Sequence, residues 1–130
     1  MDSLSIQTKK RKEIVDITNN IQAIVKKKDL NNGVVQLFLT HTTAALTTAD
    51  LDPGTDLDML DAFEEMIPKL NYRHPHDPSH VPSHILSSLI GTSLTLLVKD
   101  GELVLGTWQR VVLVELDGPK DRIVIVSFQE

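Results

Sequence analysis

The sequence predicts a single α+β domain built from two sheet layers, or from one sheet flanked by helices. Short apolar segments of strand character lie at both ends of the chain, and segments with helical periodicity lie between them. The chain has 130 residues, of which 41% are hydrophobic and 24% charged, as is typical of a globular protein with one core. We therefore expect residues 1–130 to form one domain.

The first third of the chain predicts three strands and one helix. Apolar residues in 4–7 and 14–17 indicate two short strands joined by a charged turn. Thr18 is a candidate N-cap for a helix that runs to the cations and glycine before residue 34. The nearly continuous apolar run 34–39 predicts a strand covered on both faces, so His41 leaves the core at a strand end.

The middle of the chain predicts two helices separated by a stiff loop. Thr55 is a candidate N-cap for a helix that ends at Pro68, with its acidic residues on a solvated face. Three prolines make the first part of 72–84 a loop. Ser79 or Ser83 can then cap a helix that runs to Gly91.

The last part of the chain predicts only strands. Apolar runs at 94–99, 102–105, 108–116 and 122–128 are separated by turn residues. The Asp100-Gly101 pair between two such runs is a strong hairpin signal.

Composition excludes several classes of function. The chain has no cysteine, which excludes disulfides and thiolate chemistry. A net charge of −5 argues against a nucleic-acid partner. No apolar run approaches the roughly 18 residues of a membrane span, so we expect no membrane partner and a cytoplasmic protein.

The five histidines are concentrated in one part of the chain. They are His41, His74, His76, His80 and His84. Imidazoles from a strand end and a stiff loop could bind a divalent cation such as zinc, which takes three protein ligands in catalytic sites. They could equally serve as acid–base groups without a metal, or as hydrogen-bonding surface residues. Spacing alone leaves the ligand set undecided.

Other polar residues could complete such a site. Asp50, Asp52 and Glu115 are candidates for a fourth ligand, for a partner that orients a histidine, or for a general base. Trp108 and Gln109 could form the wall of a pocket.

Five sequence blocks resemble the signature of the YjbQ-like family, also called the secondary thiamine-phosphate synthase enzyme family. The resemblance extends from about Ser5 to Glu130, and the blocks are His41-Thr42-Thr43-Ala44-Ala45-Leu46-Thr47, Tyr72-Arg73-His74, Pro82-Ser83-His84-Ile85, Ser87-Ser88-Leu89-Ile90-Gly91-Thr92-Ser93-Leu94 and Gly106-Thr107-Trp108-Gln109. It implies an α+β fold with a mixed β-sandwich and two to three helices. It also implies a homotrimer with the histidine site near a subunit boundary.

The resemblance also implies roles for individual residues. His41, His74 and His84 correspond to the family's histidines and are the expected metal ligands, whereas His76 and His80 are treated as peripheral. Asp50 stands where the family usually has a glutamate. We expect Asp50, Gln109 and Glu115 to act in catalysis, and Thr42, Ser88 and Trp108 to contact a cofactor or substrate.

The activity implied is weak formation of thiamine phosphate from a pyrimidine diphosphate and a thiazole phosphate. We expect a metal-assisted enzyme acting on small phosphorylated heteroaromatic substrates, with zinc as the best match for imidazole ligands. Magnesium is expected if the synthase reaction is real. Two other hypotheses remain, namely a metal-free histidine acid–base enzyme and a non-catalytic metabolite-binding or structural homotrimer.

Overall fold

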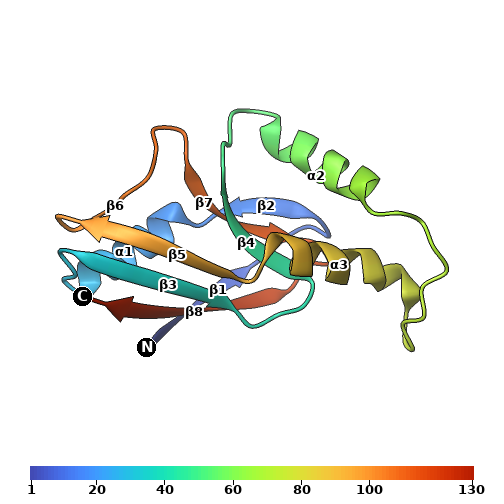
Figure 1. The fold of residues 1–130 in the computed structure, drawn as a ribbon, viewed down its shortest axis with the longest axis horizontal. Coiled ribbons are helices and arrows are strands. Elements are labelled where there is room, and N and C mark those ends of the chain that lie inside the picture. The colour runs from blue at the N-terminus through green and yellow to red at the C-terminus, as the bar shows by residue number, and fades with distance from the viewer.

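The computed structural model describes residues 1–130 and has eight strands, three α-helices and one short 3-10 helix (Figure 1). In chain order the elements are β1 (Asp2–Gln7), β2 (Glu13–Asp16), α1 (Thr18–Lys27), β3 (Gly33–Leu39), β4 (Ala44–Ala49), α2 (Thr55–Met66), the 3-10 helix η1 (Pro78–His80), α3 (Val81–Ile90), β5 (Ser93–Lys99), β6 (Glu102–Leu103), β7 (Arg110–Glu115) and β8 (Asp121–Gln129).

The strands form two sheets. One sheet has the order β1-β8-β3-β5-β6 and the other has the order β2-β7-β4. The predicted α+β class with two sheet layers is confirmed. Every strand pair is antiparallel, so neither sheet is mixed, in contrast to what the resemblance implies.

The main core lies between the two sheets and α1. Because side chains alternate along a strand, Val111 and Leu113 of β7 face this core, together with Ile21 of α1 and Leu37 of β3. Val112 of β7 faces a second, smaller cluster on the other side of the three-stranded sheet. β7 is therefore covered on both faces, which explains its unbroken apolar sequence.

Two helices cover the outer face of the three-stranded sheet. The second cluster joins that sheet to Leu86 of α3, with Leu60 and Phe63 of α2 packed against it. The Ser87 hydroxyl of α3 donates to the Ala44 carbonyl at 2.7 Å, and the Ser83 hydroxyl to the Leu116 carbonyl at 2.9 Å. These buried bonds hold α3 against the start of β4 and the end of β7.

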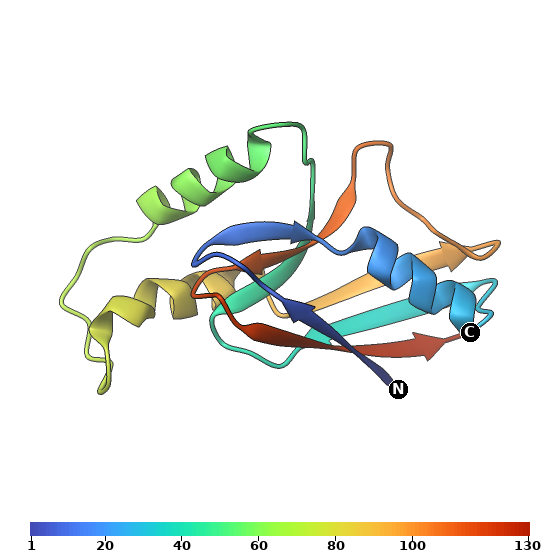
Figure 2. The same ribbon diagram turned by 180° about the vertical axis from the view of Figure 1, so that it is seen from behind.

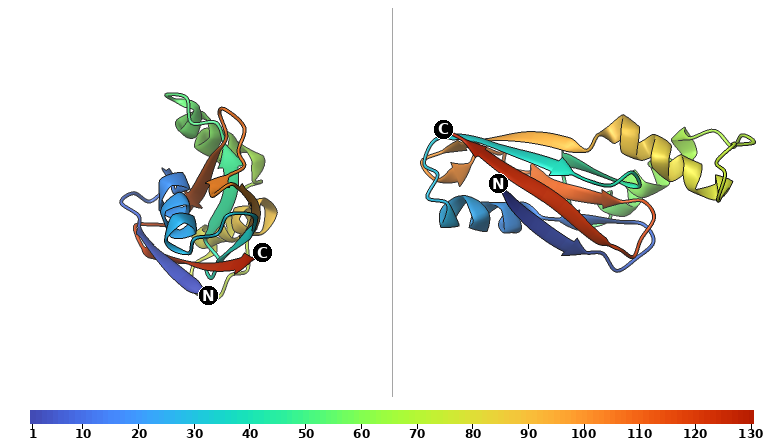
Figure 3. Two further views of the ribbon diagram at one scale, coloured as in Figure 1. Left: turned by 90° about the vertical axis from the view of Figure 1, so that its left-hand side faces the viewer. Right: turned by 90° about the horizontal axis from the view of Figure 1, so that it is seen from below.

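The molecule is elongated, and its two ends differ. Figures 2 and 3 show α1 and both termini toward one end, whereas α3 and the loop between α2 and η1 lie toward the other. None of the helices combines the length and apolar character needed to traverse a lipid bilayer.

The predicted helix caps are wrong in detail. Ile17 and Gly54 occupy the N-cap positions of α1 and α2, so Thr18 and Thr55 are the first residues inside their helices. At α1 the Asp16 carboxylate accepts from the Thr18 amide at 3.0 Å and so satisfies a helix-end donor from one position earlier. Before α3, Asp77 caps η1 by accepting from the Ser79 amide at 2.9 Å.

Candidate functional site

A buried ion pair lies beneath the histidine region. Glu115 at the end of β7 and Arg122 in β8 have exposed fractions of 0% and 1%. The Arg122 Nε donates to one carboxylate oxygen at 2.9 Å and Nη2 donates to the other. Nη2 also donates to the carbonyl and hydroxyl oxygens of Thr43, at 3.0 and 2.9 Å. The guanidinium therefore fixes the loop between β3 and β4.

Glu115 is held as a carboxylate. Burial alone would raise its pKa, but hydrogen bonds from Arg122, Thr8 and the Asp117 amide outweigh burial and lower the pKa below its usual value. One oxygen accepts from the Thr8 hydroxyl at 2.6 Å, and the other accepts from the Leu116 amide at 3.0 Å. Because both oxygens are bonded and buried, Glu115 positions its neighbours and does not present a free oxygen to a substrate, whereas the sequence analysis expected it to act in catalysis.

His41 follows β3 and is bound to β8. Its Nε2 accepts from the Ile123 amide at 2.9 Å, so the proton of the neutral ring is on Nδ1. Burial lowers the pKa of His41, and the Arg122 charge lowers it further, against a smaller opposing effect of Glu115. His41 is therefore a neutral ring at pH 7.

His84 lies in α3 and, like His41, carries its proton on Nδ1. Its Nδ1 lies 3.1 Å from the Thr42 carbonyl oxygen. A carbonyl oxygen can only accept, so Nδ1 carries the proton and Nε2 keeps a free lone pair. Thr42 thus contributes its backbone to the site, in the loop that Arg122 fixes.

The histidines of the proline-rich loop gather beside His84. The His74 ring stacks on the His84 ring with 5.3 Å between centroids and 14° between planes. The His76 and His80 rings lie edge-on to His74, with centroids 6.0 and 6.4 Å away. The Nδ1 of His74 accepts from the amides of His76 and Asp77 at 3.3 and 3.2 Å, which closes the loop on itself.

Two adjoining cavities open onto these residues. The first, of about 370 Å³, is lined entirely by polar residues, namely Thr40, His41, Thr42, Thr43, His80, His84, Asp117, Lys120 and Arg122. The second, of about 500 Å³, shares Thr40, His41, Thr42 and His84 and extends to Ser87, Ser88, Gly91 and Thr92. We call them together the histidine cavities. The structure brings to them His41, His84, Thr42 and Ser88, which the sequence analysis singled out, and adds His80, which was expected to be peripheral. His74 lines neither cavity.

Asp50, Trp108 and Gln109 lie elsewhere. They line a shallow cavity of about 450 Å³ at the far end of β4. Gln109 is held there by a 3.0 Å bond from its amide to the Thr48 hydroxyl, and the Asp50 carboxylate accepts from the Asp52 amide at 2.9 Å. Six residues of strand separate this end from the loop of His41, a length of roughly 20 Å. Within one chain these residues therefore do not meet the histidines.

No group of three or more His, Asp or Glu side chains is arranged to hold a metal ion. A neutral imidazole binds a metal through its unprotonated nitrogen. In His41 and His74 that nitrogen accepts backbone hydrogen bonds, and only in His84 is it free. The three expected ligands thus do not fit a zinc ion in this arrangement.

Sequence reasoning missed Arg122, which holds the site together. The sequence pattern could have revealed it, because Arg122 lies on the same face of β8 as Val124 and Val126, which are both buried. An arginine on the inward face of a strand requires a buried anion, and Glu115 supplies it.

Fold and site together define a two-sheet α+β protein with a histidine-lined polar cavity at the junction of α3, the loop after β3 and the start of β8. The family model described as UPF0047 protein YjbQ-like matches residues 2–130. The chain belongs to this family.

Relatives cover the chain almost from end to end. A UPF0047 protein of Archaeoglobus fulgidus is 38% identical over 95% of this chain and 97% of its own length, and the UPF0047 protein YugU of Bacillus subtilis is 35% identical over 98% and 97%. A crystal structure of a YjbQ/UPF0047 protein from Clostridium acetobutylicum superposes with a TM-score of 0.90 at 34% identity, covering 99% of this chain and 100% of that one. A protein of Aeropyrum pernix superposes with a TM-score of 0.91 at 29% identity, covering 98% and 96%.

Proposed function

We propose that the chain is an enzyme that acts on a small phosphorylated or heteroaromatic substrate in the histidine cavities, with His84 as the acid–base group. The observation that carries this proposal is the bond from His84 Nδ1 to the Thr42 carbonyl, which leaves Nε2 with a lone pair in a fixed direction. A base oriented through its second nitrogen is the common arrangement in histidine-dependent catalysis.

The surroundings of His84 favour an anionic substrate. Lys120, His80 and three threonines line the polar cavity, where Lys120 also pairs with the Asp117 carboxylate at 3.2 Å. His41 is neutral and has a proton on Nδ1, so it is a donor that does not compete with His84 for a proton at pH 7. A phosphate or pyrophosphate group would find hydrogen-bond donors and a cation here. Thiamine phosphate formation, which releases pyrophosphate, is therefore the first reaction to assay.

The residues at the far end of β4 would join the site from another subunit. Asp50 and Gln109 lie beside the far end of β4, too far to reach His84 of their own chain, so a homotrimer is the arrangement in which they could take part. Complementation would test this. In mixed trimers of His84→Ala and Asp50→Ala chains, about a quarter of the sites would receive both intact residues. No recovery on mixing, with both variants trimeric, would contradict shared sites.

The acid–base role of His84 has a direct test. His84→Ala should lower kcat for any substrate found by roughly a hundredfold or more, the usual contribution of a general acid–base group. His76→Ala is the matched control, because His76 is another imidazole of the cluster but lines neither histidine cavity. Equal rates for the wild type and His84→Ala would refute the role. A specific ligand without turnover in any assay would instead favour the non-catalytic metabolite-binding or structural trimer.

Metal-assisted chemistry is the second candidate. Its support is the concentration of imidazoles, with His74 stacked on His84 and His41 lining the same cavities as His84. Binding a zinc ion through all three would require His41 and His74 to give up their backbone hydrogen bonds. Elemental analysis of the purified protein, and the rate after exhaustive chelation, separate the two mechanisms. Stoichiometric zinc that is lost in His41→Ala would favour the metal, whereas a rate that survives chelation would favour proton transfer.

A further inference from the structure

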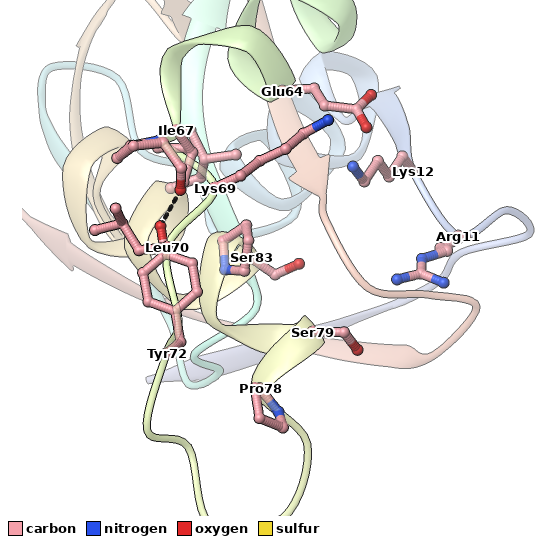
Figure 4. A pocket seen from close by; sticks show the side chains of 13 residues that line it. Arg11, Lys12, Glu64, Ile67, Lys69, Leu70, Tyr72, Pro78, Ser79 and Ser83 are labelled. Atoms are coloured by element: carbon pink, nitrogen blue, oxygen red, sulfur yellow. Dashed lines mark hydrogen bonds between the residues drawn. The ribbon is translucent and has the colours of Figure 1, made fainter.

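A third cavity lies on a different face of α3 from the histidines. It measures about 390 Å³ and is bordered by Ser79 of η1 and by Pro82, Ser83 and Leu86 of α3, which lie on one face of that helix (Figure 4). The opposite walls come from the turn between β1 and β2 and from the segment that follows α2. We call it the basic cavity.

The charge of the basic cavity contrasts with that of the chain. Arg11, Lys12 and Lys69 line it, and Glu64 is its single acidic residue, in a chain with a net charge of −5. None of the three cations forms an ion pair or a side-chain hydrogen bond within the chain. Figure 4 shows Lys12 and Lys69 pointing toward the region of Glu64. The local excess of positive charge is thus available to a ligand.

The remaining wall is apolar and partly aromatic. Ile67 and Leu86 are buried at its base. The Tyr72 hydroxyl donates to the Pro68 carbonyl, which holds the aromatic ring at the cavity edge. A ligand would therefore meet cations on one side and apolar surface on the other.

We propose that the basic cavity binds a small organic phosphate, with its phosphate among Arg11, Lys12 and Lys69 and its apolar body against Tyr72 and Ile67. Three cations and one carboxylate leave an excess of two positive charges, which matches the charge of roughly −2 on a phosphate monoester at neutral pH. Arginine binds phosphate through paired hydrogen bonds, and the lysines add point charges.

This site is separate from the function proposed above, because it shares no lining residue with the histidine cavities. It does share α3 with them. A ligand in the basic cavity would therefore contact the helix that carries His84.

Tyr72 is the only tyrosine of the chain, so isotope-labelled tyrosine gives one ring signal at the basic cavity. Titration with phenyl phosphate should move this signal saturably, with a Kd on the order of 1 mM or tighter. Phenol tests the apolar part and inorganic phosphate tests the charged part, and both should bind more weakly. Phenol binding as tightly as phenyl phosphate, or no movement of the Tyr72 signal, would overturn the proposal.

Charge variants supply the matched controls. Lys69→Gln should weaken phenyl phosphate binding about threefold to fivefold, and Glu64→Gln should tighten it by a similar factor, as expected for exposed charges. Lys27→Gln, which removes an exposed cation of α1, and His84→Ala should leave the Kd unchanged. Equal weakening by Lys27→Gln and Lys69→Gln, or weakening by Glu64→Gln, would reject a specific site.

Discussion

Replacing Arg122 by methionine tests the buried ion pair. The substitution keeps an unbranched apolar stem but leaves the Glu115 carboxylate buried with no countercharge, and it removes the two bonds to Thr43. Loss of one partner of a buried pair costs about 3–5 kcal/mol, against a total free energy of unfolding of about 5–15 kcal/mol for a domain. We expect Arg122→Met to fold marginally at pH 7, as measured by urea unfolding.

The cost should depend on pH. In the wild type the pKa of Glu115 is lowered, so its contribution to stability is present above the ordinary value of 4.5 and is lost as the pH falls through the folded pKa. In Arg122→Met, burial without the guanidinium raises the pKa of Glu115, and protonation relieves the penalty as the pH falls toward 4.5. The difference in unfolding free energy between the two proteins should therefore narrow from pH 7 to pH 5.

The control is Arg110→Met. Arg110 pairs with Asp16 at 2.8 Å, but both side chains are more than a third exposed, so its loss should cost less than about 1 kcal/mol. A cost for Arg122→Met that is equally small, or that does not change with pH, would refute the reasoning.

Three further predictions concern stability. Gly118→Ala should destabilise the fold by about 1–3 kcal/mol in thermal unfolding, because its Cβ would lie 2.5 Å from the Lys10 carbonyl oxygen and 2.8 Å from the Glu115 side chain. Leu113→Ala, at a fully buried position between the sheets, should cost about 2–5 kcal/mol in urea unfolding. The pKa of His41 is lowered in the fold, so its contribution to stability is present above pH 6.5 and is lost as the pH falls toward the folded pKa. His41→Gln should therefore flatten the dependence of Tm on pH between 7.5 and 5.5.

Much of the fold could be predicted from the sequence, because apolar periodicity is a local property. The strand at 34–39, the Asp100-Gly101 hairpin and the helix that carries His84 all lie where their patterns placed them. The sheet order could not be predicted in the same way, since β1 pairs with β8 across more than a hundred residues. The caps were misplaced because Ile17 and Gly54 hold N-cap positions through backbone conformation rather than through a side-chain hydrogen bond.

The candidate site was only partly predictable for a geometric reason. Asp50 follows His41 closely in sequence, but β4 carries the chain away from the histidines between them. His80 was set aside on the resemblance, yet η1 turns it toward Asp77 and Asp117, with its Nε2 3.2 Å from the Asp77 carboxylate. The direction of a ring in a loop depends on such turns, which residue spacing does not determine.

The Glu115–Arg122 pair contributes more to the positions of Thr42 and Thr43 than to the free energy of unfolding. A buried pair adds little net free energy compared with apolar side chains of similar volume, so Glu115→Leu combined with Arg122→Met should recover most of the stability that Arg122→Met loses. The double variant would still lack the guanidinium that holds both oxygens of Thr43. The adjacent Thr42 carbonyl, which fixes the tautomer of His84, would then be free to move. A stable double variant in which nitrogen NMR shows a mixture of His84 tautomers would separate the role of the pair in stability from its role in positioning the site. An unchanged tautomer would show that Arg122 does not position the site.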